Sequence, residues 1–211
     1  MKMSLRSSIK GLYAITPDEL DTSVLLSNAR SALKGGAEVL QYRNKRADAK
    51  LRSSQALALR LLCSEFGVTF IVNDDASLAK LVDADGVHLG GADGSVTTTR
   101  TLLGAAKLIG VSCYNCQVLA RQAEQDGADY VAFGAFFQSG VKPEAVVASM
   151  NLLTQARQEL RLPIVAIGGI TPTNATQLIK AGADALAVIS AVFAADDIEQ
   201  AARQFSILVD R

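Results

Sequence analysis

Residues 180–188 read KAGADALAV, and a similar short pattern occurs three times earlier in the chain. The earlier copies are KGGAEVLQY at 34–42, LVDADGVHL at 81–89 and QDGADYVAF at 125–133. In each copy a helical segment ends, most often at a glycine, and an acidic residue after alanine leads into an apolar strand. The alanines at 37, 84, 128 and 183 are 47, 44 and 55 residues apart, which leaves room for two strand–helix units per interval. The repeat therefore predicts a long succession of strand–helix units.

Eight apolar runs fit this succession, and segments with helical spacing, such as SLAKLVDA and NATQLIKAGA, lie between them. The expected strands cover residues 10–15, 38–43, 68–72, 85–89, 108–112, 129–133, 163–167 and 184–189. Such alternation favours a parallel sheet, and the eight strands predict an α/β protein with a single (β/α)8 TIM barrel. An open doubly wound sheet is the alternative, but GxGxxG does not follow the first strand. Because no linker or change of composition interrupts the chain, residues 1–211 are expected to form one barrel domain.

The composition excludes several classes of function. Lys and Arg together number 21, as do Asp and Glu, so no net charge attracts nucleic acid. The N-terminal residues lack the apolar region of a secretory signal, and no apolar run approaches the ~20 residues of a membrane span. Three cysteines do not make a disulfide framework. We therefore expect a soluble, cytoplasmic protein that acts on small molecules and has no nucleic-acid or membrane partner.

The second expected strand ends in Gln41, Arg43 and Lys45 at alternate positions. Barrel enzymes carry their active sites at the carboxyl ends of the strands. Side chains alternate between the faces of a strand, so these three point the same way if the extended geometry continues. Two cations and an amide on one face indicate an anion site. A solvated loop with ordinary surface cations is the alternative interpretation.

The third strand runs directly into Asn73, Asp74 and Asp75. A carboxylate at the end of a buried strand is costly unless a partner compensates its charge. Asp93 follows the fourth strand, and because neighbouring strands lie about 4.8 Å apart, Asp74 and Asp93 can share one ion. Oxygen ligands without cysteine or a second histidine favour Mg²⁺ over zinc. Asp75 precedes the helical segment ASLAKL and is expected to cap that helix instead.

Glycines 168–169 follow the seventh strand and residues 189–190 end the eighth. Paired glycines let backbone N–H groups approach an anion closely. Thr171 and Pro172 have the pattern of an N-cap and first helical residue, and a helix N-terminus favours phosphate. Loops after the last two strands are the usual phosphate site of a barrel. This pattern predicts a phosphate site at the ends of the last two strands.

A longer loop follows the sixth strand and carries Ser139 and Lys142. Gly140 and Pro143 indicate a shaped loop rather than a helix. Such a loop can close over a substrate. A plain surface loop is the alternative.

Two further features carry little weight. The CYNC motif at 113–116 is a single CxxC pair, whereas a zinc site needs two more ligands and a redox motif needs a different fold setting. His88 lies between apolar residues inside the fourth strand. It is interpreted as a packed, hydrogen-bonded core histidine rather than a catalyst.

Taken in order, LYAITPD, QYRNK, IVNDD, ADGVHLG with Asp93 after it, ADYVAFGAFF, VKP and PIVAIGGIT resemble thiamine phosphate synthase. The resemblance extends from about residue 11 to residue 205. It implies a (β/α)8 barrel enzyme that joins 4-amino-2-methyl-5-hydroxymethylpyrimidine diphosphate to a thiazole phosphate, carboxylated or not. Pyrophosphate is released, and Mg²⁺ is required.

The resemblance also implies roles for individual residues. The pyrimidine diphosphate would be bound by Gln41, Arg43, Lys45, Asn73, Ser112 and Lys142. Mg²⁺ would be held by Asp74 and Asp93. The thiazole phosphate would be bound by Ser139, Gly140, Val141, Gly169, Ile189 and Ser190.

The implied mechanism is dissociative. The C–O bond to the diphosphate breaks first, and the thiazole nitrogen then attacks the pyrimidine methylene cation. The catalytic residues would be Arg43, Lys45, Lys142 and Ser112, with the cations and Mg²⁺ neutralising the leaving group. No general base is obligatory. Two carboxylates are few protein ligands for Mg²⁺, so the metal is expected to arrive with the diphosphate.

The chain departs from the family pattern at three places. Asn44 stands where the family often has Glu, and Gly91 stands where it usually has Gln. Val141 replaces a hydroxyl residue expected to contact the thiazole phosphate, and one lost hydrogen bond of this kind costs about 1–3 kcal/mol. We therefore expect weaker thiazole-phosphate binding, and Val141→Thr should lower the KM for that substrate.

The sequence leaves three rival functions. The related thiazole tautomerase has the same barrel but uses a histidine where Tyr114 stands here. A non-catalytic phosphate-binding barrel would bind the thiazole phosphate without turnover, and only the altered 138–141 loop and Gly91 favour it. An isomerase acting on a sugar phosphate would need an acid and a base paired at the strand ends, and no such pair is found. The sequence does not determine the oligomeric state.

Overall fold

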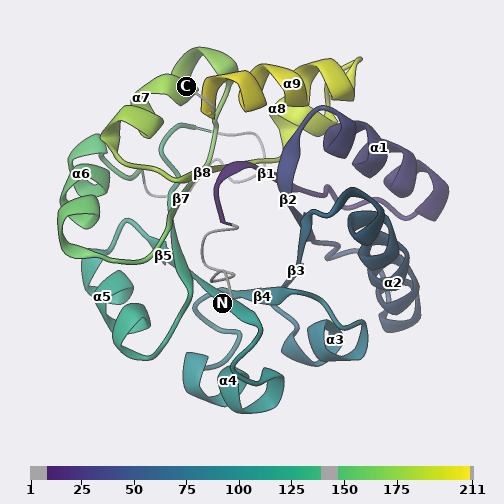
Figure 1. Cartoon of the computed structure of the whole chain (residues 1–211), viewed down its shortest axis with the longest axis horizontal. Coiled ribbons are helices and arrows are strands. Elements are labelled where there is room, and N and C mark those ends of the chain that lie inside the picture. The colour runs from purple at the N-terminus through teal and green to yellow at the C-terminus, as the bar shows by residue number, and fades with distance from the viewer. Residues whose placement is uncertain (1–8, 139–146, 210–211) are drawn as a thin grey trace.

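The strands of the chain close into a barrel in the order in which they occur (Figure 1). The computed structural model describes residues 9–138 and 147–209. Within these residues, eight strands pair in parallel, and β1 pairs with β8 through Gly11–Ala14 and Ala185–Val188. The strands are β1 (Gly11–Ile15), β2 (Ala37–Tyr42), β3 (Thr69–Asn73), β4 (Gly86–Leu89), β5 (Leu108–Tyr114), β6 (Tyr130–Phe133), β7 (Ile164–Ile167) and β8 (Ala185–Val188). The predicted (β/α)8 barrel is confirmed.

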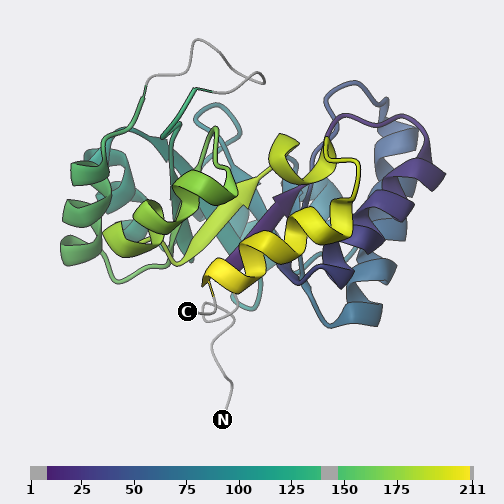
Figure 2. The same cartoon turned by 90° about the horizontal axis from the view of Figure 1, so that it is seen from above.

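The helices lie outside the barrel and follow the strands in alternation. They are α1 (Thr22–Lys34), α2 (Ala49–Phe66), α3 (Ala76–Leu81), α4 (Val96–Leu103), α5 (Gln117–Gln125), α6 (Met150–Glu159), α7 (Pro172–Ala181), α8 (Ser190–Phe193) and α9 (Ile198–Val209). In the side view of Figure 2, α7 and α9 lie in front of β8 and β1. Several helices begin at a side chain that accepts a backbone N–H, as at Asp21, Asp48 and Ser95. Asp75 caps α3 by accepting from the Leu78 N–H, so its predicted capping role is confirmed.

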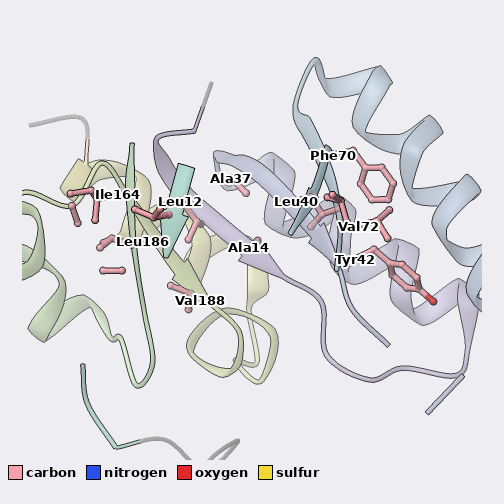
Figure 3. Close-up of a cluster of buried hydrophobic side chains, with 14 of the residues drawn as sticks. Leu12, Ala14, Ala37, Leu40, Tyr42, Phe70, Val72, Ile164, Leu186 and Val188 are labelled. Atoms are coloured by element: carbon pink, nitrogen blue, oxygen red, sulfur yellow. The ribbon is translucent and has the colours of Figure 1, made fainter. Parts of the chain in front are cut away.

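Two layers of apolar side chains stabilise this arrangement. Alternate residues of β1 show the division, because Leu12 and Ala14 belong to the layer between strands and helices, while Tyr13 and Ile15 belong to the layer inside the barrel. Figure 3 shows part of the outer layer, where Tyr42 and Phe70 lie on the side of β2 and β3 that faces α2. Strands buried on both faces read as continuous apolar runs, and for this reason their positions were visible in the sequence.

All three cysteines, Cys63, Cys113 and Cys116, are free thiols, as expected for a chain without a disulfide framework. Among the helices of the described residues, none is long and apolar enough to cross a membrane. That residues 1–211 form one domain stays a prediction.

Candidate active site

A cavity of about 1120 Å³ lies at the carboxyl ends of the strands. All ten predicted site residues that the structure describes line it: Gln41, Arg43, Lys45, Asn73, Asp74, Asp93, Ser112, Gly169, Ile189 and Ser190. The residues within strands converge on the cavity because side chains alternate between the two faces of a strand. Gln41, Asn73 and Ser112 occupy inward-facing positions of β2, β3 and β5. The remaining predicted residues, Ser139, Gly140, Val141 and Lys142, lie outside the described residues.

The β1–α1 loop holds the two cations that follow β2. The strand ends at Tyr42, one residue earlier than predicted, so strand alternation does not explain how Arg43 and Lys45 reach the cavity. Instead, Thr16 Oγ1 accepts from the Arg43 N–H at 2.9 Å and donates to the Arg43 carbonyl at 3.0 Å. Asp18 Oδ1 accepts from Arg43 Nη1 at 3.0 Å and from the Lys45 N–H at 2.8 Å.

Thr16 and Asp18 were not predicted from the sequence. The available signal was their place directly after the first strand, in the stretch Thr16-Pro17-Asp18. Asn44, by contrast, faces away from the cavity and is buried. Its amide donates to the Glu19 carbonyl at 2.6 Å and to Gln55 Oε1 at 3.1 Å, which gives this departure from the family pattern a structural role.

Two carboxylates face each other at the ends of β3 and β4. Burial and the neighbouring Asp93 raise the pKa of Asp74, and only Lys45, whose Nζ lies 3.4 Å from Asp74 Oδ2, opposes the rise. Asp93 Oδ2 accepts from the Gly90 N–H at 2.8 Å, which fixes that carboxylate at the start of its loop. The Asp74 N–H donates to the His88 carbonyl at 2.8 Å.

A hard cation fits this pair. A divalent ion would stabilise these two facing carboxylates, of which Asp74 is partly buried and Asp93 is exposed, and carboxylate oxygens suit Mg²⁺. Within residues 9–138 and 147–209, no group of three His, Cys, Asp or Glu side chains could hold a metal ion. A cation here would therefore take its other ligands from water and substrate.

The opposite side of the cavity is made of backbone. Gly168 and Gly169 have φ angles of +100° and +62°, a region that side chains rarely adopt. A Cβ on Gly169 would overlap the carbonyl oxygen of Gln138 and lie 2.8 Å from the carbonyl carbon of Phe137. Asn174 Nδ2 donates to the Gly169 carbonyl at 3.0 Å and so supports the turn from inside α7. Thr171 is the N-cap of α7, as predicted.

Aromatic and polar side chains form the floor of the cavity. His88 is 8% exposed, and burial lowers its pKa to about 4. Its Nδ1 lies 3.1 Å from Tyr130 Oη and its Nε2 lies 2.9 Å from Ser112 Oγ, so the predicted packed, hydrogen-bonded histidine is confirmed. Tyr13 and Tyr130 were not predicted as part of the site, and their inward positions in β1 and β6 were the available signal.

The rim above Asp93 contains Gly91 and Tyr114. The Gly91 N–H donates to Tyr114 Oη at 3.1 Å, and a Cβ on Gly91 would meet that oxygen at 3.2 Å. Tyr114 has a φ of +53° and remains half exposed. Gly91, which departs from the family pattern, is thus hydrogen-bonded to Tyr114 of the next strand.

The chain is similar to known proteins over most of its length. The family model described as thiamine monophosphate synthase matches residues 12–192. A thiamine-phosphate synthase from Methylobacillus flagellatus is 58% identical over 197 residues, which cover 93% of this chain and 94% of that protein. One from Acidithiobacillus ferrooxidans is 54% identical over 204 residues, with 95% and 94% covered. Among solved structures, the thiamine phosphate pyrophosphorylase from Pyrococcus furiosus has a TM-score of 0.88 at 36% identity, covering 98% of each chain.

Proposed function

The chain belongs to the thiamine monophosphate synthase family, and we propose that its strand-end cavity is the active site that joins a pyrimidine diphosphate to a thiazole phosphate. The protein is a transferase of thiamine biosynthesis that forms thiamine phosphate and releases pyrophosphate. The observation that carries the proposal is the gathering of ten predicted residues around one cavity, with charged side chains on one side and glycine backbone on the other. A cytoplasmic location stays a prediction.

The charged side suits the diphosphate. Arg43 and Lys45 present two cations to a leaving group whose negative charge grows as the C–O bond breaks, and preorganised charges of this kind stabilise the transition state. Asp18 holds the Arg43 guanidinium in place, so little reorganisation is needed during the reaction. Gln41, Asn73 and Ser112 would complete this substrate site. Lys142 would also contact the diphosphate, by resemblance alone.

Asp74 and Asp93 would hold Mg²⁺. When bound, the ion would neutralise part of the charge of the diphosphate. Lys45 also pairs with Asp74, with 3.4 Å between Nζ and Oδ2, and partly compensates the charge of the carboxylate. Because the protein would supply only two carboxylate ligands, we expect the metal to arrive together with the diphosphate.

The backbone side suits a phosphate monoester. Its N–H groups at Gly169, Ile189 and Ser190 would bind the phosphate of the thiazole substrate, because glycine lets the anion approach the main chain closely. Ser139, Gly140 and Val141, which lie outside the described residues, would contribute by resemblance alone. Substrates held on opposite sides of one cavity would face each other across its centre.

The floor supports a dissociative substitution that needs no general base. His88 is the single histidine of the chain, and both of its ring nitrogens are already engaged by Tyr130 and Ser112. Burial keeps the imidazole neutral, because its pKa is lowered to about 4. The chemistry would therefore rest on stabilising the leaving group rather than on removing a proton.

The test measures thiamine phosphate formed from both substrates with Mg²⁺, followed by its fluorescent oxidation product. Asp74→Asn is the informative variant, since asparagine tolerates the φ of +64° at this position and removes only the charge. Asp75→Ser is the matched control, because it removes a neighbouring carboxylate and keeps a good N-cap on α3.

We expect product from the wild type and from Asp75→Ser, and a loss of at least about 100-fold in kcat for Asp74→Asn. Absence of product from a folded wild type that still binds the thiazole phosphate would contradict the proposal. It would favour a barrel that binds the phosphate without turnover.

A further inference from the structure

A chain of five side chains crosses the floor of the cavity inside the barrel. Gln41 Nε2 on β2 donates to Tyr13 Oη on β1 at 2.8 Å, and Tyr13 Oη lies 2.9 Å from Tyr130 Oη on β6. Tyr130 Oη lies 3.1 Å from His88 Nδ1 on β4, and His88 Nε2 lies 2.9 Å from Ser112 Oγ on β5. The chain therefore joins two predicted substrate-binding residues, Gln41 and Ser112, through three residues that so far have no role.

The middle of this chain is sealed from water. Tyr13 is 1% exposed and Tyr130 is fully buried, and their rings pack against each other with centroids 6.1 Å apart. Gly110 on β5 makes room for Tyr130, since a Cβ at that position would overlap the phenol ring. Burial raises the pKa of both phenols above the ordinary value, so each keeps its single proton. Buried hydroxyls of this kind must find their hydrogen-bond partners among the neighbouring side chains.

The hydrogen bonds from Gln41 to Ser112 all run in one direction, because each hydroxyl and the neutral imidazole have a single proton to donate. The Gln41 amide nitrogen can only donate, so Tyr13 Oη accepts from it and has its own proton left for Tyr130. Tyr130 in turn donates to His88 Nδ1. A neutral imidazole that accepts at Nδ1 carries its proton on Nε2, and that proton is donated to Ser112 Oγ.

We propose that Tyr13, Tyr130 and His88 are positioning residues that set the hydrogen-bonding character of the two ends of the chain. Ser112 Oγ accepts from His88 and is left with its proton, which it presents to the cavity as a donor. Gln41 uses its amide nitrogen inside the barrel and presents its carbonyl oxygen as an acceptor.

This inference rests on the proposed function for its ligand. An aminopyrimidine diphosphate offers both complements, because its exocyclic amino group donates whereas its ring nitrogens and phosphate oxygens accept. If the hydrogen bonds ran in the opposite direction, the donor and acceptor roles at both ends would be exchanged. Ser112 would then direct its proton at His88. Recognition of this substrate class would then lose one complementary contact at each end.

The first measurement concerns the histidine alone and needs no activity. Because the protein contains one histidine, imidazole-¹⁵N labelling gives a single pair of ring-nitrogen resonances. In the free enzyme between about pH 6 and pH 8, we expect the neutral tautomer with the proton on Nε2. Finding the proton on Nδ1, or a mixture of both tautomers, would overturn the inference, since it would mean that the Gln41 amide is turned over and that Ser112 donates inward.

The second measurement cuts the chain at its centre. Tyr13→Phe removes the link between Gln41 and Tyr130, so we expect the His88 tautomers to become mixed. We expect kcat/KM for the pyrimidine diphosphate to fall about tenfold, with the KM for the thiazole phosphate unchanged. In a Ser112→Ala background the same change should have a clearly smaller effect, because the part that acts through Ser112 is gone and only the part that acts through Gln41 remains.

Tyr42→Phe is the matched control. Tyr42 is also a buried tyrosine, but it faces α2, where its hydroxyl donates to Gln55 Oε1 at 2.9 Å. We expect this variant to lose stability while keeping the Nε2–H tautomer and the wild-type kcat/KM. Equal losses of kcat/KM in Tyr13→Phe and Tyr42→Phe, or full additivity of Tyr13→Phe with Ser112→Ala, would overturn the positioning role. If the wild type made no thiamine phosphate, the proposed function would fail, while the tautomer would still decide the direction of the chain.

Discussion

The two sides of the cavity are built from different materials. The charged wall at the ends of β2, β3 and β4 consists of the side chains of Arg43, Lys45, Asp74 and Asp93. The backbone wall at the ends of β7 and β8 consists of main-chain segments at Gly168, Gly169, Ile189 and Ser190. The charged wall carries ion pairs and a raised pKa at Asp74, whereas the backbone wall depends on φ angles open to glycine.

This difference determines how each wall can fail. A side chain can be replaced by an isosteric residue that removes charge and keeps shape, so the charged wall is sensitive to chemistry. A main-chain N–H survives substitution of its own side chain, so the backbone wall is sensitive to shape alone. Each substrate should therefore respond to a different kind of mutation.

The largest expected effect tests the shape of the backbone wall. In Gly169→Ala the new Cβ overlaps the Gln138 carbonyl oxygen, so the turn must move. We expect the KM for the thiazole phosphate to rise about 100-fold, since a shift near 1 Å is enough for such a loss. The KM for the pyrimidine diphosphate should stay within about twofold of the wild type.

Gly67→Ala is the control for this prediction. Gly67 ends α2 with a φ of +66°, close to the +62° of Gly169, but a Cβ there meets no described atom within 4 Å. It therefore imposes the same backbone strain without the overlap. If Gly67→Ala raised the thiazole-phosphate KM as much as Gly169→Ala, overlap would not be the cause.

The next effect concerns stability at the floor between the two walls. Burial lowers the pKa of His88 from 6.5 to about 4, so below pH 6.5 the unfolded chain takes up a proton that the folded chain refuses. The stability that the neutral histidine contributes is thus complete above pH 6.5 and is lost as the pH falls toward 4. Between pH 7 and pH 5 the wild type should lose about 2 kcal/mol of unfolding free energy through this residue.

His88→Gln should remove this part of the pH dependence, as measured by urea unfolding at both pH values. Asp74 acts in the opposite direction, because a raised carboxyl pKa favours the folded state as the pH falls toward its titration range. Comparing the two proteins cancels that contribution. Equal pH dependence in the wild type and in His88→Gln would mean that the buried histidine titrates normally.

A smaller effect tests the support of the charged wall. Asp18→Asn weakens the ion pair with Arg43, whose side chain is 18% exposed, so the guanidinium loses its anchor. We expect the KM for the pyrimidine diphosphate to rise about tenfold with the thiazole-phosphate KM unchanged. Glu65→Gln breaks the Arg30–Glu65 pair at 2.8 Å on the surface and should leave both constants unchanged. A rise in both KM values for Asp18→Asn would show that the two walls are not independent.

The smallest effect concerns the rim of the charged wall. Tyr114→Phe removes the acceptor of the Gly91 N–H, and the loop that carries Asp93 loses one exposed contact. The Mg²⁺ concentration needed for half-maximal rate should rise about twofold, because a solvent-exposed hydrogen bond contributes little. An unchanged requirement would mean that the Gly90 N–H and Asp93 contact alone sets the loop.

Much of the fold could be predicted because its signals are local. Each buried parallel strand is an apolar run between amphipathic segments, and all eight appeared within one or two residues of their observed bounds. The facing of Gln41 also followed from strand alternation, whereas Asn73 and Ser112 were assigned to the substrate through the resemblance. The reach of Arg43 and Lys45 did not follow from alternation, since β2 ends at Tyr42 and the loop after β1 holds them.

By itself the sequence determined the order of strands and helices, the strand ends at which polar residues gather, and the resemblance that assigns them to two substrates. Only the tertiary structure decided which of those residues touch. Tyr13 and Tyr130 lie 117 residues apart and each reads as an ordinary core aromatic, yet closing the barrel brings their hydroxyls within 2.9 Å. The physical reason is that burial depends on a residue's own strand, whereas a hydrogen-bond partner depends on the register of strands far away in the chain.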